Sequence, residues 1–76
     1  MRTLGEIKHP EMKISLFSWN GKYLVKFEQG FCEQTYKFEH LEVEETQLRD
    51  HVVGSLTEQA LKTFSDMHSA RNAATD

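Results

Sequence analysis

The sequence predicts an α+β domain in which an antiparallel β-meander of three to four strands is covered on one face by one C-terminal α-helix. Two observations carry this prediction. Residues 12–38 contain three runs rich in aromatic, aliphatic and β-branched side chains, separated by short turn signals that contain glycine. Residues 55–72 instead repeat apolar side chains at helical spacing. No run rich in proline, glycine or serine divides the sequence, so residues 1–76 are expected to form a single small domain, with the meander in residues 1–38.

The first two strands are predicted from the stretch LFSWNGKYLVKF, residues 16–27. Asn20-Gly21 is the preferred pair for a two-residue type I′ turn, because both turn positions need a positive φ. This turn sets Trp19 opposite Lys22 and therefore fixes the register of the whole hairpin. One face carries Met12, Ile14, Leu16, Tyr23, Val25 and Phe27, and the other carries Lys13, Ser15, Phe17, Trp19, Lys22, Leu24, Lys26 and Glu28.

A third strand is predicted over residues 31–38, after a reversal at Gln29-Gly30. A two-residue loop at that position sets Cys32 opposite Phe27. Gln34 then falls on the apolar face, where its amide needs a hydrogen-bond partner, unless the loop is one residue longer and the register slips.

Residues 3–8 are a candidate fourth strand, joined to the meander by a turn at His9-Pro10-Glu11. Proline cannot donate to a ladder, which suits a turn or an edge strand. The alternation of apolar and polar residues is poor here, so the sequence leaves this strand open.

The helix is predicted to begin at a capping box formed by Ser55 as N-cap and Glu58 three residues later. It is expected over residues 55–72, with a frayed tail at 73–76. Residues 39–54 form an acidic connector in which Leu48 and Val52 are four residues apart, and the sequence does not decide between helical turns and an ordered loop. The apolar stripe of the helix consists of Leu56, Ala60, Phe64 and Met67, flanked by Leu61 and His68.

One helix covers only one face of a sheet, so the other face is predicted to stay open. Exposed apolar patches on small proteins usually mark interaction sites. The alternative is that these aromatic residues only pack against their neighbours across the hairpin. The candidate interaction face consists of Phe17, Trp19, Leu24, Lys13, Lys22 and Lys26, with Lys37, Glu28 and Glu33 beside them.

Self-association is the first functional prediction, because a domain of 76 residues has a thin core and this one has a single cysteine. We therefore expect a homodimer that buries the candidate face, with an unrelated protein partner as another occupant of the same patch. The second prediction is single-stranded nucleic-acid binding, with aromatic side chains stacking on bases and lysines contacting phosphates. Residues 1–38 hold six Lys/Arg and four Asp/Glu, a net charge of +2, whereas residues 39–66 hold two and seven, a net charge of −5. The overall charge of −3 argues against a dedicated polyanion binder.

The sequence contains no motif that indicates catalysis or the binding of a cofactor or metal. The four histidines lack metal-ligand spacing, and Cys32 is expected to be a core residue rather than a nucleophile. We therefore expect a protein that is not an enzyme and binds no cofactor or metal. The first residues lack the apolar run of a signal peptide, and no stretch approaches ~18 apolar residues, so a soluble cytoplasmic protein that does not enter a membrane is expected.

Overall fold

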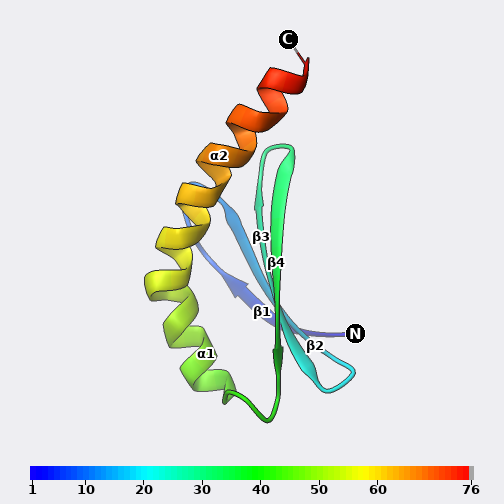
Figure 1. Ribbon diagram of the computed structural model, residues 1–76. Helices are drawn as coiled ribbons and strands as arrows, with labels where there is room; N and C mark the ends of the chain where they lie inside the picture. The colour runs from blue at the N-terminus through cyan, green and yellow to red at the C-terminus, as the bar shows by residue number, and fades with distance from the viewer. Residues whose placement is uncertain (76) are drawn as a thin grey trace.

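The computed structural model describes residues 1–75 and has the predicted α+β architecture (Figure 1). Its four strands form one antiparallel meander in the order β1-β2-β3-β4. A bent helical region follows the sheet. The elements are β1 Arg2–Ile7, β2 Lys13–Trp19, β3 Lys22–Gln29, β4 Cys32–Glu39, α1 Glu45–His51, a π-helical turn Val52–Leu56 and α2 Thr57–Thr75. The strand that the sequence left open therefore exists as β1.

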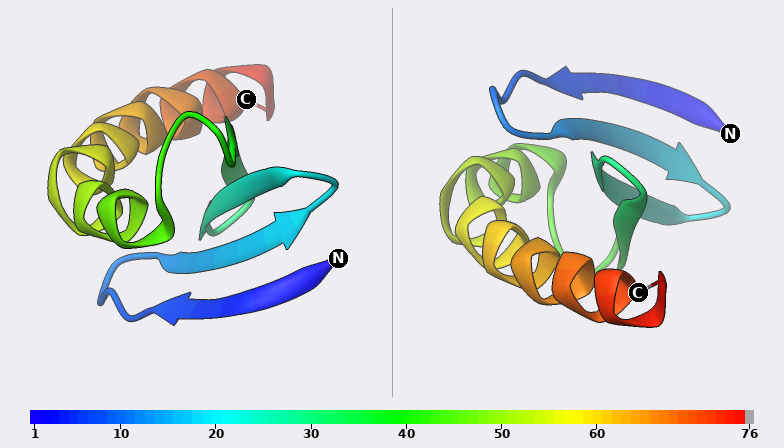
Figure 2. Two further views of the ribbon diagram at one scale, coloured as in Figure 1. Left: turned by 90° about the horizontal axis from the view of Figure 1, so that it is seen from below. Right: turned by 90° about the horizontal axis from the view of Figure 1, so that it is seen from above.

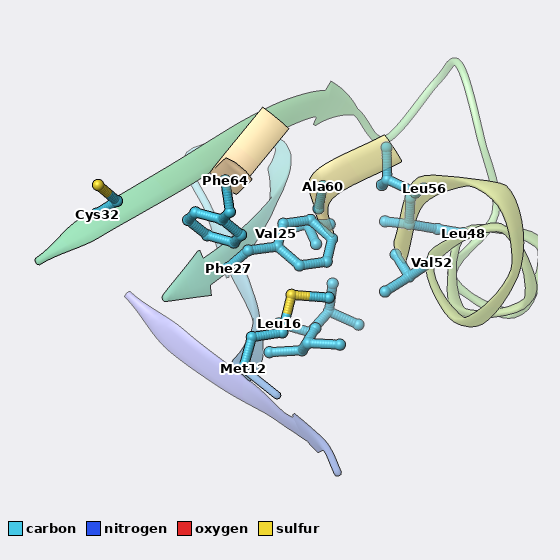
Figure 3. Packing of buried hydrophobic residues seen from close by; sticks show 11 residues of the cluster. Met12, Leu16, Val25, Phe27, Cys32, Leu48, Val52, Leu56, Ala60 and Phe64 are labelled. Atoms are coloured by element: carbon cyan, nitrogen blue, oxygen red, sulfur yellow. The ribbon is translucent and has the colours of Figure 1, made fainter. Parts of the chain in front are cut away.

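The sheet is strongly twisted, and both helices lie against the same face of it (Figure 2). The core fills the space between them, with apolar side chains from β2 and β3 meeting those of the helices (Figure 3). The predicted helical stripe is confirmed, since Ala60 and Phe64 are fully buried. The buried core consists of Met12, Ile14, Leu16, Val25, Phe27, Cys32, Leu48, Val52, Leu56, Ala60 and Phe64.

The register of the first hairpin is confirmed. Asn20 and Gly21 both have a positive φ, 54° and 77°, as a type I′ turn requires. Trp19 pairs with Lys22 and Phe17 with Leu24. The two faces of this hairpin therefore carry the side chains that the sequence assigned to them.

The pairing predicted for the second hairpin is wrong by two residues. The turn lies at Gly30-Phe31, with φ of 58° at Gly30, so Cys32 pairs with Gln29 and Gln34 pairs with Phe27. A shift of two residues keeps every side chain on its predicted face, because strand side chains alternate with a period of two. The amide of Gln34 finds the partner that it needs, because its Nε2 donates to the carbonyl of Ala60 at 2.9 Å.

The helical region begins ten residues earlier than predicted. Leu48 in α1 and Val52 in the π-helical turn are fully buried. Their burial stabilises helix within residues 39–54, the segment expected to be a connector. The predicted N-cap, Ser55, lies instead at the bend between α1 and α2, where its hydroxyl is 3.1 Å from Nδ1 of His51. A Gly-Ser pair and a π-helical turn are recognised causes of such bends. The buried hydroxyl of Thr57 donates to the Val52 carbonyl, which satisfies a backbone group at the bend.

Candidate interaction surface

The face of the sheet opposite the helices is called the outer face. The strand pairings assign its side chains, because directly opposed residues lie on the same side of a sheet. It consists of Thr3 and Glu6 from β1, Lys13, Ser15, Phe17 and Trp19 from β2, Lys22, Leu24, Lys26 and Glu28 from β3, and Glu33, Thr35, Lys37 and Glu39 from β4. All six predicted site residues lie on it.

The apolar part of the outer face is a cluster of three side chains at the turn end of the first hairpin. Phe17 and Leu24 are directly paired and half-buried, and Trp19 is 53% exposed. Among residues 1–75, the core and the hydrophobic side chains packed against it include none of the three. The cross-strand contacts expected in the alternative interpretation therefore cover Phe17 and Leu24 only in part, and they leave half of Trp19 in water.

The charged part of the outer face is balanced, with four lysines and four glutamates. Several of these charges pair within the sheet. Lys13 lies 3.6 Å from Glu6, and Lys26 lies 3.8 Å from Glu28 and 3.5 Å from Glu33. Two of the three lysines predicted to contact a ligand are thus engaged with carboxylates, and a face of zero formal charge attracts polyanions weakly at long range.

A second arrangement of polar side chains, not predicted from the sequence, joins the end of β3 and the start of β4 to α2. Nε2 of Gln29 donates to the Glu11 carbonyl at 3.0 Å, which leaves its Oε1 to accept from Nε2 of His68 at 2.8 Å. The other ring nitrogen of His68, Nδ1, then faces the thiol of Cys32, with 3.6 Å between nitrogen and sulfur. A nucleophile, a base and a group that orients the base are the parts of a covalent catalytic site. Cys32, which Figure 3 shows at the margin of the core, is only 8% exposed, so we interpret these contacts as structural hydrogen bonds at the edge of the core.

The remaining histidines make local contacts. His40 lies 3.1 Å from the Ser18 hydroxyl and against the Tyr23 ring, and His9 accepts from the backbone of Glu11. Within the described residues, no group of three or more His, Cys, Asp or Glu is placed to hold a metal ion. An open hollow of about 610 Å³ lies beside the β1–β2 connection, lined by residues 6–10 and 12–14.

The contacts of His68 and His40 could not be found from sequence patterns, because their members are far apart in the chain. Cys32 and His68 are separated by 36 residues, and Ser18 and His40 by 22. Over residues 1–75, no helix is both long enough and apolar enough to span a bilayer. Comparison of the chain with protein-family models, curated proteins and solved structures finds no match.

Proposed function

We propose that this protein is a non-enzymatic interaction module that self-associates by packing its outer face against the outer face of a second copy. The observation that supports this most directly is the half-exposed Trp19, which lies beside Phe17 and Leu24 on the face away from the helices. Burial of apolar surface stabilises an association by about 25 cal/mol per Å² before the costs of binding are subtracted. Aromatic anchors of this kind are typical of interface centres.

The balanced charge of the outer face supports self-association over the nucleic-acid alternative. A surface with equal numbers of lysines and glutamates can pair opposite charges with a rotated copy of itself. A nucleic-acid platform instead needs a basic excess, which lysines already paired with Glu6, Glu28 and Glu33 do not supply.

Trp19 itself reports on the proposed interface, since it is the only tryptophan in the sequence. Its emission should shift to shorter wavelength as the protein is concentrated from about 1 to about 100 µM, because association in this affinity range removes the indole from water. The mass measured by sedimentation should rise over the same range. Emission that stays at the wavelength of a water-exposed indole throughout contradicts the proposal.

Two phenylalanine variants test the location of the interface. Phe17→Ala keeps the reporter and removes its apolar neighbour, so it should weaken the Trp19-reported association by about tenfold or more. Phe31→Ala is the matched control, because Phe31 is 84% exposed but lies at the tip of the second hairpin. Equal effects of the two substitutions would contradict the assignment.

An oligonucleotide titration distinguishes the alternative function. Single-stranded DNA at low salt should leave Trp19 emission unchanged if the outer face is a protein interface. Quenching that disappears with added salt would instead assign the face to nucleic acid.

A further inference from the structure

The last strand of the sheet, β4, has one edge without a neighbouring strand. In an antiparallel ladder, alternate residues direct both backbone groups toward the partner, and the others direct theirs outward. The N–H of His40 donates to the Gly21 carbonyl at 3.0 Å, which extends the β3–β4 pairing and shows that even-numbered residues face β3. Glu33, Thr35, Lys37 and Glu39 therefore direct their backbone groups toward the free edge.

The free edge of β4 is regular and little protected. The N–H of Glu39 donates to the Glu42 carboxylate at 3.3 Å. For Glu33, Thr35 and Lys37, no loop or side-chain hydrogen bond in the described part of the chain engages the backbone. Three consecutive outward positions are thus open to pairing, and natural proteins usually block such edges.

The opposite edge of the sheet, formed by β1, is irregular and has a backbone carbonyl that is already hydrogen-bonded. β1 has an irregularity between Thr3 and Gly5, and Gly5 has a φ of 135°. The Leu4 carbonyl accepts a hydrogen bond from Nη2 of Arg49 at 2.8 Å. A bulge and a capped carbonyl are devices that prevent edge pairing, so only β4 offers a regular template.

The side chains of β4 are complementary to a second copy of the same strand in one register. Rotation about a twofold axis at Thr35 pairs Thr35 with its own copy and sets Glu33 opposite Lys37 twice. Moving the axis to Glu33 or to Lys37 opposes like charges. An axis at Tyr36 sets Glu33 opposite Glu39, and an axis at Gln34 pairs Glu33 with Thr35 and gains no ion pair.

The helix-side residues of β4 also favour this occupant. Tyr36 and Phe38 pack against the core but are only half-buried, whereas Val25 and Phe27 on the adjacent strand are fully buried. The core side chains are therefore only partly covered along β4. In the register centred on Thr35, Phe38 lies opposite Cys32 and Tyr36 opposite Gln34 of the second copy, which extends this layer across the junction.

We propose that β4 pairs edge to edge with β4 of a second copy of this chain, in the antiparallel register centred on Thr35. The product is one sheet of eight strands with the helices of both copies on the same side. The outer face remains uncovered, so this pairing neither requires nor prevents the association proposed above.

Backbone amide exchange tests the pairing directly. The amide of Thr35 should exchange at least about tenfold more slowly at high protein concentration than at low concentration, because it becomes hydrogen-bonded in the pair. The amide of Tyr36, which already faces β3, should show no comparable change. Exchange at Thr35 that does not depend on concentration overturns the proposal.

A charge swap tests the register, and it is made in a Trp19→Ala chain so that association through the outer face does not contribute. Glu33→Lys or Lys37→Glu alone opposes like charges twice and should raise the dimer Kd about tenfold, while the double swap should restore it to within about threefold. Glu28→Lys is the matched control, because it also removes a partner of Lys26 but lies on β3 and should leave the Kd unchanged.

The two proposals fail separately in these measurements. A Trp19→Ala chain that sediments as a monomer at about 200 µM overturns the edge pairing and leaves the outer-face proposal standing. If the doubly swapped variant has a dimer Kd as high as the single variants, the proposed register is wrong. If the Thr35 amide is protected at high concentration but Trp19 emission does not shift, the edge pairing is supported and the proposed association through the outer face is contradicted.

Discussion

Leu48 and Leu41 show how strongly the role of one residue type depends on its position in this chain. Both lie in the acidic segment after β4, yet Leu48 is 1% exposed and Leu41 is 97% exposed. Leu48 packs among β-strand and helix side chains of the core (Figure 3). Leu41 instead belongs to the turn that leads to α1. Hydropathy alone treats the two leucines as equal, which is why the sequence could not describe this segment.

The matched substitutions Leu48→Ala and Leu41→Ala should therefore differ widely. Removing a buried leucine side chain costs its transfer free energy plus that of the cavity, so the free energy of unfolding should fall by about 2–5 kcal/mol. Leu41→Ala should change it by less than about 0.5 kcal/mol. Urea unfolding followed by circular dichroism measures both. Similar losses for the two variants would mean that Leu48 is not part of the core.

Buried polar side chains mark the limit of what residue patterns predict. The sequence indicated that Gln34 needed a partner on the apolar face, and the carbonyl of Ala60 supplies it. It could not identify that carbonyl, because the contact depends on where the helix crosses the sheet. The same holds for His68, whose position beside Cys32 and Gln29 follows from helix packing.

At the level of elements, the two hairpins differ in how strongly their turns specify the register. Asn20 and Gly21 both accept a positive φ, so only one placement of a two-residue turn fits the sequence, and the predicted register is confirmed. The second hairpin has only Gly30, which can be the first or the second residue of a two-residue turn. The chain uses it as the first, with the exposed Phe31 second and the Arg71 guanidinium 4.3 Å from its ring centroid.

The first turn should consequently be sensitive to the residue at its second position. Gly21→Ala forces an L-residue to adopt a φ near 77°, which should lower the free energy of unfolding by about 1–2 kcal/mol. A Cβ at Gly21 would meet no atom within 4 Å, so this cost is conformational and not steric crowding by neighbours. Asn20→Gly is the control and should change stability by a few tenths of a kcal/mol. Thermal unfolding of both variants measures the difference, and an Ala variant as stable as the parent would contradict the turn assignment.

The helical region shows a local signal overridden by packing. Ser55 and Glu58 have the spacing of a capping box, which predicted a helix start. Burial of Leu48 and Val52 favours helix before that point, so the helical region bends at Gly54-Ser55 instead of beginning there. Tertiary contacts outweigh a capping contribution of about 1 kcal/mol when two aliphatic side chains become fully buried.

At the scale of the whole molecule, the shape is more extended than the length of the chain requires. A compact domain of 76 residues has a radius of gyration of about 11 Å, whereas this chain has 13.4 Å and extents of 43 × 23 × 19 Å. One sheet face and one sheet edge remain uncovered, and the last turns of α2 are exposed. The outer face and the edge of β4 are the two surfaces on which we propose that a second copy binds.

Self-association of either kind makes thermal stability depend on protein concentration, since folded pairs dissociate as they unfold. A hundredfold rise in concentration contributes about 2.8 kcal/mol per dimer. Unfolding two chains of 76 residues has an entropy of about 0.32 kcal/mol per kelvin, so Tm should rise by up to about 9 °C between about 2 and about 200 µM, and by less where part of the protein is monomeric. The control combines Trp19→Ala with Glu33→Lys, which acts on both proposed surfaces, and its Tm should vary far less over this range. Calorimetry at several concentrations measures the slope, and a parent chain with a constant Tm would show that it unfolds as a monomer and that neither surface binds a second copy.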